Sequence, residues 1–209
     1  MQLALRSYHG RLPYGRHRMS TYPHRGFTIF LTGLAAAGKT TIATRLQQLL
    51  AAEYGRSVTV LDGDVVREML SSGLTFSRAD RELNIRRIGY VAGEVSRHGG
   101  ICIVAAIAPY RGARADARAR VLQSGGFYEI HVATPLAECE RRDPKGLYRQ
   151  ARLGEVRNLP GIDAPYEAPE RPELRIDTRL LSVEEETRQI LQLAVSDGLL
   201  EERHAEVAA

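Results

Sequence analysis

The chain has 209 residues, of which 44% are hydrophobic and 26% charged, and its formal net charge at pH 7 is +4. Residues 1–25 hold five Arg and no acidic residue, so the remaining chain carries 4 − 5 = −1 and is close to neutral. A near-neutral body without Trp argues against a surface for nucleic acid or another polyanion, and no apolar run reaches membrane-spanning length.

The first 25 residues are rich in Arg, His and Tyr and show no clear periodicity. They could form an Arg-rich transit extension, a disordered tail, or a stretch ahead of a second start at Met19. We expect a disordered basic tail at 1–25, one folded domain at 26–200, and a C-terminal tail at 201–209.

Strand and helix patterns alternate along this body. Strands are expected at 27–32, 58–61, 101–107, 128–132 and 174–176. Helices are expected at 40–53, 65–71, from a Ser77–Asp80 capping box to about His98, and at 113–123, 135–141 and 183–193. Apolar strands separated by helices predict an α/β fold, a P-loop-type three-layer sandwich with a central parallel sheet.

The segment after the first strand reads GLAAAGKT, from Gly33 to Thr40, and fits GxxxxGK[ST]. Between a strand and a helix, this pattern predicts a loop whose backbone N–H groups bind phosphates. Lys39 would reach the β- and γ-phosphates, and the Thr40 hydroxyl would bind Mg²⁺. A glycine turn that carries a lysine by chance would not explain why Gly, Lys and Thr all occupy the required positions. The segment therefore predicts a nucleoside triphosphate site.

Two carboxylates, Asp62 and Asp64, follow the second strand in the sequence LDGDVVR. Beside a P-loop they could organise Mg²⁺ and accept a proton from an acceptor hydroxyl, although a turn with an Asp helix cap would look the same. Arg67 follows one turn later and could bind an anionic acceptor, or it could be a solvated helix arginine.

The long helix predicted after Ser77 places polar residues on its inward face. Its buried stripe consists of Ile85, Ile88, Ala92 and Val95, and its solvated face of Arg86, Glu94 and Arg97. Arg81 and Asn84 lie on the buried stripe one turn earlier. Inward polar groups are costly unless they are paired or bind something, so contact with a ligand is favoured over structural pairing.

The segment at 142–172 is expected to form a mobile lid. Its first part, from Arg141 to Arg157, carries six basic and two acidic residues together with Pro and Gly. A solvated charge run is the common alternative, but the position after the last strand of the cleft suits a lid that closes over phosphates.

Three further side chains are expected to be structural. Cys102 and Cys139 lie far apart in apolar patterns, which favours buried, reduced thiols over a disulfide or a metal site. His131 lies in a strand pattern and is expected to be structural rather than a ligand.

Six segments carry a resemblance to a known family: GLAAAGKTTIA, LDGDVVR, DRELNIRRIGYVA, IAPYR, DPKGLY and GIDAPYEAP, within about 26–177. In this order they resemble the adenylyl-sulfate kinases, P-loop enzymes that phosphorylate the ribose 3′-hydroxyl of adenosine 5′-phosphosulfate with MgATP. The resemblance implies sulfate activation, ATP and Mg²⁺ as cofactors, a homodimer, and a possible functional link to ATP sulfurylase. The two reduced thiols favour the cytoplasm. The near-neutral body and the lack of a long apolar run predict no nucleic-acid or membrane partner.

The resemblance also implies roles for individual residues. ATP would bind at Gly33, Leu34, Ala35, Ala36, Ala37, Gly38, Lys39, Thr40 and Thr41. Asp64 would orient or deprotonate the acceptor hydroxyl, while Asp62 and Thr40 support Mg²⁺ and Lys39 assists catalysis. Phe76 would stack on the adenine, and Lys145 would be the lid lysine. The substrate contacts would be Asp64, Arg67, Phe76, Arg81, Asn84, Ile107, Ala108, Lys145, Asn158 and Leu159.

Three positions depart from the family pattern. Ala108 stands where many relatives have a Ser proposed as a phosphorylated intermediate, so direct transfer is expected here. Ala35 and Ala36 replace a common Ser-Gly, and Ala36 would be strained if its φ must be positive. Leu159 replaces a frequent Phe, so stacking on that side should be weaker.

Three other functions compete with this interpretation. Another P-loop kinase acting on a nucleoside or sugar acid would share the P-loop but would not need DPKGLY or the Arg67, Arg81 and Asn84 set. A regulatory nucleotide-binding subunit without catalysis would fit Ala108 but would not need both Asp62 and Asp64. Nucleic-acid binding through the Arg-rich tail ranks third.

Overall fold

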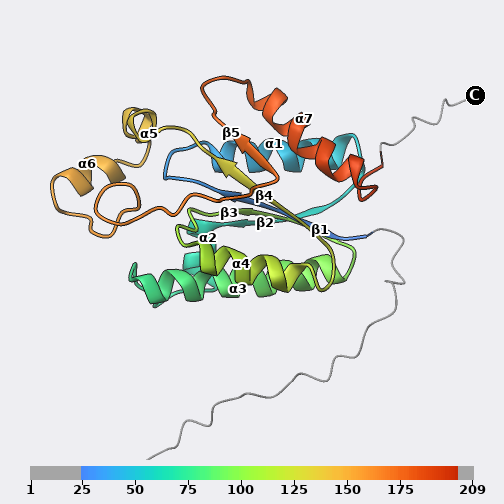
Figure 1. Ribbon diagram of the computed structural model, residues 1–209, viewed down its shortest axis with the longest axis horizontal. Helices are drawn as coiled ribbons and strands as arrows, with labels where there is room; N and C mark the ends of the chain where they lie inside the picture. The colour runs from blue at the N-terminus through green and yellow to red at the C-terminus, as the bar shows by residue number, and fades with distance from the viewer. Residues whose placement is uncertain (1–24, 202–209) are drawn as a thin grey trace, which may run out of the picture.

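The computed structural model describes residues 25–201 (Figure 1). The tails predicted at 1–25 and 201–209 therefore lie outside the described residues, apart from Arg25 and Glu201. No helix within the described range is both long and apolar enough to cross a membrane.

A single sheet of five parallel strands forms the centre of the described chain, as predicted. The strands are β1 (Phe27–Thr32), β2 (Val58–Asp62), β3 (Ile101–Ala105), β4 (Gly126–Val132) and β5 (Leu174–Ile176), in the spatial order β2-β3-β1-β4-β5. Strand β1 lies in the middle, with Phe27 opposite Ile101 on one side and Gly126 on the other. The chain therefore changes direction across the sheet at β1, which is where ligands bind in such folds.

Helices cover both faces of the sheet and complete the predicted three layers (Figure 1). Helices α1 (Lys39–Ala52) and α7 (Val183–Ser196) cover one face, and α2 (Gly63–Met69), α3 (Arg78–Arg97) and α4 (Arg111–Val121) cover the other. Helices α5 (Leu136–Arg142) and α6 (Leu147–Arg152) extend beyond the end of the sheet; α5 corresponds to the helix expected at 135–141, and α6 lies in the region predicted as a lid.

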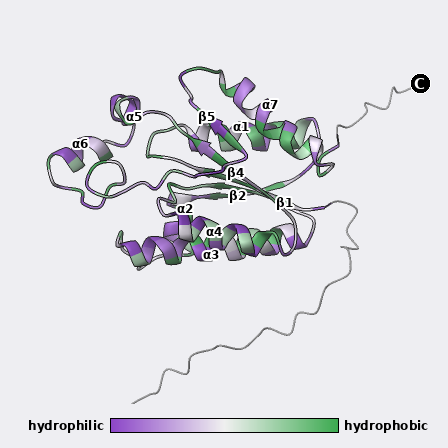
Figure 2. Cartoon of the chain, in the orientation of Figure 1, coloured by the Kyte–Doolittle hydropathy of each residue, from purple (hydrophilic) through white to green (hydrophobic). Residues whose placement is uncertain are grey.

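The apolar side chains form two cores, one on each face of the sheet. Alternate residues of β1 point to opposite sides, so Ile29 lies in the core beneath α1 and Phe30 in the core beneath α3. Figure 2 shows the strands as largely hydrophobic and the outer helix surfaces as largely hydrophilic. Cys102 and Cys139 are buried and free, as expected, and burial raises the pKa of the Cys102 thiol to about 12.

Local hydrogen bonds explain where the elements differ from expectation. Helix α2 begins two residues early because Asp62 caps it and accepts the Asp64 N–H. The predicted capping box of α3 is only half formed: Ser77 accepts the Asp80 N–H, but the Asp80 carboxylate accepts the Thr75 N–H at 2.9 Å instead of closing the box. Strand β3 ends at Ala105 rather than at residue 107, and helix α6 was not expected within the lid.

Candidate active site

Two adjoining cavities lie at the carboxyl end of the sheet. The larger, of about 410 Å³, is lined by the P-loop, the start of α2 and lid residues 142–147. The smaller, of about 240 Å³, is lined by α2, Phe76, the first turns of α3 and residues 156–159. Both cavities share the lining residues Gly63, Asp64, Ala106, Ile107 and Leu147. Two ligands bound side by side would therefore meet beside Asp64.

The P-loop wraps around the N-terminus of α1 with little free space. A side chain at Gly33 would lie 2.3 Å from the carbonyl oxygen of Val132, and Gly38 has a φ of 110°, which glycine tolerates best. The Thr134 hydroxyl fixes the loop by donating to the Ala37 carbonyl at 2.8 Å. Ala36 has a positive φ, of 56°. An alanine is strained at such an angle, as the sequence analysis anticipated for this position.

Lys39 is buried and lines the larger cavity. Its Nζ donates to the carbonyl oxygens of Gly33 at 3.0 Å and Leu34 at 2.6 Å. Burial lowers the pKa of Lys39 to about 8, partly opposed by the charges of Cys139, Asp62 and Asp64. Its position in the P-loop is the one from which a lysine contacts the β- and γ-phosphates of a bound triphosphate.

Thr40 and Asp62 form a compact oxygen-rich pair beside Lys39. The Thr40 hydroxyl donates to Asp62 Oδ2 at 2.9 Å, and Asp62 Oδ1 accepts the Asp64 N–H at 3.0 Å. No cluster of three or more His, Cys, Asp or Glu that could hold a metal occurs among residues 25–201. A hydroxyl and a carboxylate are nevertheless the hard ligands that suit Mg²⁺ when phosphates and water supply the remaining oxygens.

Asp64 and Lys145 face one another across the junction of the two cavities. They form an ion pair in which the side chains are 72% and 63% exposed, respectively. The hydrogen bond to Asp64 raises the pKa of Lys145. This contact joins the lid to the start of α2 and places a carboxylate and an ammonium at the shared boundary.

Three arginines line the smaller cavity, and two of them, Arg67 and Arg81, lie over one aromatic ring and form no ion pair among the described residues. Arg67 and Arg81 lie over the Phe76 ring, with guanidinium carbons 4.4 and 5.0 Å from its centroid. Burial lowers the pKa of both guanidinium groups. Asn84 also lines the cavity, and its buried Oδ1 has no hydrogen-bond partner. Two cations and an unpartnered amide oxygen suit an anionic, hydrogen-bonding ligand.

The remaining predicted substrate contacts lie around this cavity in different ways. Ile107, Ala108 and Leu159 line it, whereas Asn158 contributes its backbone carbonyl, which accepts from Arg81 Nη2 at 2.7 Å.

His131 is buried and stacks on Tyr166 with ring centroids 5.8 Å apart, and burial lowers its pKa to about 4. These contacts support the structural role expected for His131.

The sequence interpretation missed several lining residues. Arg142 and Leu147 line the larger cavity, and Val156 and Arg157 line the smaller one. Tyr148 is almost fully buried, and its hydroxyl donates to the P-loop carbonyl of Ala35 at 3.0 Å. Arg142 and Arg157 belong to the basic run that predicted the lid, but nothing in that run distinguishes them from its exposed members.

Comparison with known proteins gives a consistent match over nearly the whole domain. The sequence model of the family described as adenylylsulphate kinase matches residues 25–177. The chain is 50% identical over 177 residues to an adenylyl-sulfate kinase of Picosynechococcus sp., covering 85% of this chain and 98% of that protein. It is also 50% identical over 177 residues to a sulfate adenylyltransferase of Chaetomium globosum, of which it spans only 31%.

A solved structure supports the same match in three dimensions. The Mycobacterium tuberculosis APS kinase CysC in complex with AMPPNP and APS is similar with a TM-score of 0.79 and 41% sequence identity. The similarity covers 83% of this chain and 99% of that one. The family resemblance inferred from the six sequence segments is thereby confirmed.

Proposed function

The chain belongs to the adenylylsulphate kinase family, and from this membership we propose that it transfers the γ-phosphate of ATP to the ribose 3′-hydroxyl of adenosine 5′-phosphosulfate. The observation that carries the proposal is the meeting of two cavities at Asp64. Phosphoryl transfer needs a donor site and an acceptor site with a common boundary, because its catalysis is mostly positioning and charge neutralisation.

The larger cavity is the proposed ATP site. The backbone N–H groups of the P-loop and the ammonium of Lys39 bind the phosphates, over the residues 33–41 named in the sequence analysis. Thr40 and Asp62 would hold Mg²⁺, which neutralises charge on the β- and γ-phosphates when bound. The hydrogen bond between their side chains supports this assignment, because it already brings both oxygens to one point.

The smaller cavity is the proposed site of the phosphosulfate. Arg67 and Arg81 bind its anionic group, and this role is supported because both line the cavity and neither forms an ion pair within 25–201. Asn84 accepts a hydrogen bond from the nucleoside, and Phe76 stacks on the adenine. Leu159, Ile107, Ala108 and the carbonyl of Asn158 complete the cavity.

The transfer itself requires one proton acceptor and several cations. The oxygen of the 3′-hydroxyl bonds to the γ-phosphorus while Asp64 accepts the proton of that hydroxyl. The bond between the γ-phosphorus and the β,γ-bridging oxygen breaks, and ADP leaves. Lys145, released from Asp64 by the incoming substrate, turns with Lys39 toward the transferring phosphoryl group. Ala108 has no hydroxyl to phosphorylate, so the phosphate passes directly from donor to acceptor.

A coupled assay of ADP formation tests this function. The purified chain is supplied with MgATP and, separately, adenosine 5′-phosphosulfate, adenosine, AMP or gluconate. We expect turnover only with the phosphosulfate, and loss of at least about a hundredfold in kcat for Asp64→Asn because the proton acceptor is removed. Asp116→Asn, an exposed carboxylate on α4, is the matched control and should match the unmodified chain.

Other outcomes of the assay would assign the chain differently. Turnover with gluconate or adenosine would make it a sibling P-loop kinase. ATP binding without turnover on any acceptor would favour a regulatory subunit.

Assembly and location belong to the same proposal. We expect a cytoplasmic homodimer whose mass by light scattering is twice the 23.2 kDa of one chain. A functional link to ATP sulfurylase is supported by the Chaetomium globosum sulfate adenylyltransferase, which contains a segment similar to this chain. A monomer or a larger assembly at micromolar concentration would contradict the dimer.

A further inference from the structure

Three consecutive carbonyl oxygens after β3 are each held by a different part of the fold. They belong to Ile107, Ala108 and Pro109, the residues that line the smaller cavity on the sheet side. The donors are Thr32 Oγ1 of β1 at 2.7 Å, Arg114 Nη1 of α4 at 2.7 Å, and the Glu167 N–H near the end of the 142–172 segment at 2.8 Å. Because all three carbonyl groups are hydrogen-bonded, the backbone of residues 107–109 is fixed against the sheet.

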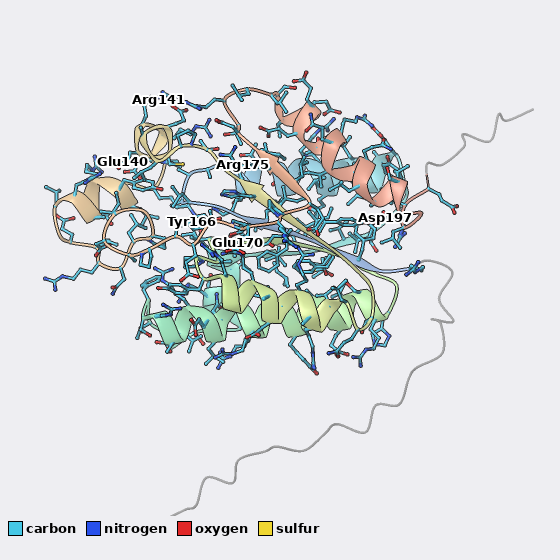
Figure 3. The ribbon with its side chains drawn as sticks, in the orientation of Figure 1. Glu140, Arg141, Tyr166, Glu170, Arg175 and Asp197 are labelled. Atoms are coloured by element: carbon cyan, nitrogen blue, oxygen red, sulfur yellow. The ribbon has the colours of Figure 1, made fainter. Side chains whose placement is uncertain are left out.

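Thr32 is itself held by a second side chain. The hydroxyls of Thr32 and Tyr166 lie 3.0 Å apart, and since Thr32 donates to Ile107, Tyr166 is the donor of that bond. Figure 3 shows Tyr166 at the end of the sheet, between the two helical layers. The end of the 142–172 segment therefore supports the loop in two ways, indirectly through the bond from Tyr166 to Thr32 and directly through the Glu167 N–H.

Arg114 is the side chain that joins these segments. It is 2% exposed, and each of its three nitrogens has a partner in a different segment. Its Nε donates to Glu129 Oε1 of β4 at 2.6 Å, Nη1 to the Ala108 carbonyl, and Nη2 to the Glu167 carbonyl at 2.7 Å. A guanidinium presents donors in a rigid fork, so one residue can serve three acceptors that a lysine ammonium could not reach together.

Ala108 has a backbone conformation that requires such support. Its φ is 46°, in the left-handed region that residues with a Cβ seldom adopt. Conformations of this kind persist only where surrounding contacts hold them, and they cluster at ligand sites.

We propose that Arg114 is a positioning residue for the acceptor: it holds Ala108 in its left-handed conformation and thereby fixes the wall of the cavity that binds the phosphosulfate. The inference rests on the proposed function for the identity of that acceptor. Arg114 lines neither cavity and acts through the loop. Its replacement should therefore lower kcat/KM for the acceptor and leave KM for ATP nearly unchanged.

The chain offers a matched control on the same helix. Arg118 lies one turn after Arg114 and also bonds to Glu129, at 3.3 Å, and to Glu173, at 2.7 Å. Within the described chain, the side chain of Arg118 contacts Glu129, Glu173 and Phe127 and makes no hydrogen bond or ion pair with residues 107–109. Replacing it perturbs the same ion network without releasing the loop.

The first test compares Arg114→Lys with Arg118→Lys by steady-state kinetics. For Arg114→Lys we expect kcat/KM for adenosine 5′-phosphosulfate to fall by roughly tenfold or more, because small misplacements of a reacting group are costly, with KM for ATP within about twofold of the unmodified value. Arg118→Lys should change neither constant by more than about twofold. The proposal would be overturned if both variants lost kcat/KM for adenosine 5′-phosphosulfate equally. It would also be overturned if Arg114→Lys changed KM for ATP by as large a factor.

A rescue variant separates positioning from general destabilisation. Glycine adopts positive φ without strain, so Ala108→Gly in the Arg114→Lys background should recover part of the lost kcat/KM, measured relative to Ala108→Gly alone. Failure of glycine to recover any of it would contradict the proposal. If Arg114→Lys does not fold, Glu129→Gln keeps the arginine but weakens its anchor, and a smaller loss confined to the acceptor is then expected.

Hydrogen exchange tests the positioning without any turnover. The amides of Ile107, Ala108 and Tyr110 should exchange faster in Arg114→Lys than in the unmodified chain, and Arg118→Lys should leave their exchange unchanged. Unchanged exchange in Arg114→Lys would refute the inference. Absence of turnover by the unmodified chain would refute the proposed function instead, so the two failures are distinguishable.

Discussion

Ala36 has a φ of 56° at a P-loop position where the family commonly has glycine. A left-handed conformation costs a residue with a Cβ roughly 1–2 kcal/mol, and the loop retains it because its neighbours are fixed by Thr134 and by the start of α1. Strain at one residue of a phosphate site therefore lowers the stability of this chain without removing a binding group.

Ala36→Gly is expected to raise the free energy of unfolding by about 0.5–1 kcal/mol, because relief of strain exceeds the extra entropy that glycine gives the unfolded chain. Ala37→Gly is the control: Ala37 is fully buried and does not have positive φ, so its replacement should be destabilising. Chemical denaturation measures both. A loss of stability in Ala36→Gly comparable to that in Ala37→Gly would contradict the prediction.

Lys39 gives ATP binding a pH dependence. Its pKa is lowered from 10.5 to about 8 by burial, so the side chain loses its charge as the pH rises through 8. Between pH 8 and 10.5 the unfolded chain binds the proton that the folded chain has lost, so the contribution of this group to stability rises with pH over that window. The phosphates of ATP favour the charged form of Lys39, so the affinity for ATP should fall as the pH rises over the same window.

We expect the dissociation constant for ATP to increase above about pH 8 and ATP binding at pH 9 to take up protons. Calorimetry in two buffers of different ionisation enthalpy measures the uptake, and Lys39→Met should abolish it. Binding at pH 9 without proton uptake by the unmodified chain would show that Lys39 remains charged there.

The residues of the P-loop and the LDGD segment could be predicted because each motif is local and its chemistry depends on spacing along the chain. Arg81 and Asn84 could be predicted because helical periodicity places them on the buried face of α3, where the structure confirms that they are buried. The role of Arg114 could not be predicted from the sequence. Its partners Ala108, Glu129 and Glu167 are far apart in the chain and become neighbours only because of the order of the strands in the sheet.

At the scale of elements, the lid shows why boundaries are hard to predict. The Pro, Gly and charged residues of 142–172 indicated irregular structure, yet α6 forms there because Asp143 accepts the backbone N–H groups of Tyr148 and Arg149. This carboxylate acts from five and six residues away, outside the spacing of an ordinary capping motif.

Tyr148 anchors this lid helix to the P-loop through the carbonyl of Ala35. Tyr148→Phe removes that hydrogen bond while keeping the buried ring, so we expect KM for ATP to rise a few-fold, in line with about 1 kcal/mol for one hydrogen bond. The same change should speed limited proteolysis within 142–172. Tyr90→Phe, on the exposed face of α3, is the control. Equal behaviour of the two variants would show that the lid is held by other contacts.

For the molecule as a whole, the convergence of the site could be predicted from the parallel sheet alone. The P-loop follows β1, Asp62 ends β2, and Ile107 follows β3, so all three meet at one edge. The division of this edge into two cavities could not be predicted, since it depends on how the lid residues 142–159 fold over it.

The central place of β1 in the sheet also has a consequence for biosynthesis. Among the strands of the described chain β1 is translated first, and its neighbours β3 and β4 follow roughly seventy and one hundred residues later. Pairings so distant in sequence are slow to form because a long loop must close before they contribute. The contacts that fix the P-loop, among them the bond from the Thr134 hydroxyl to the Ala37 carbonyl, therefore become available only after β4 has been translated.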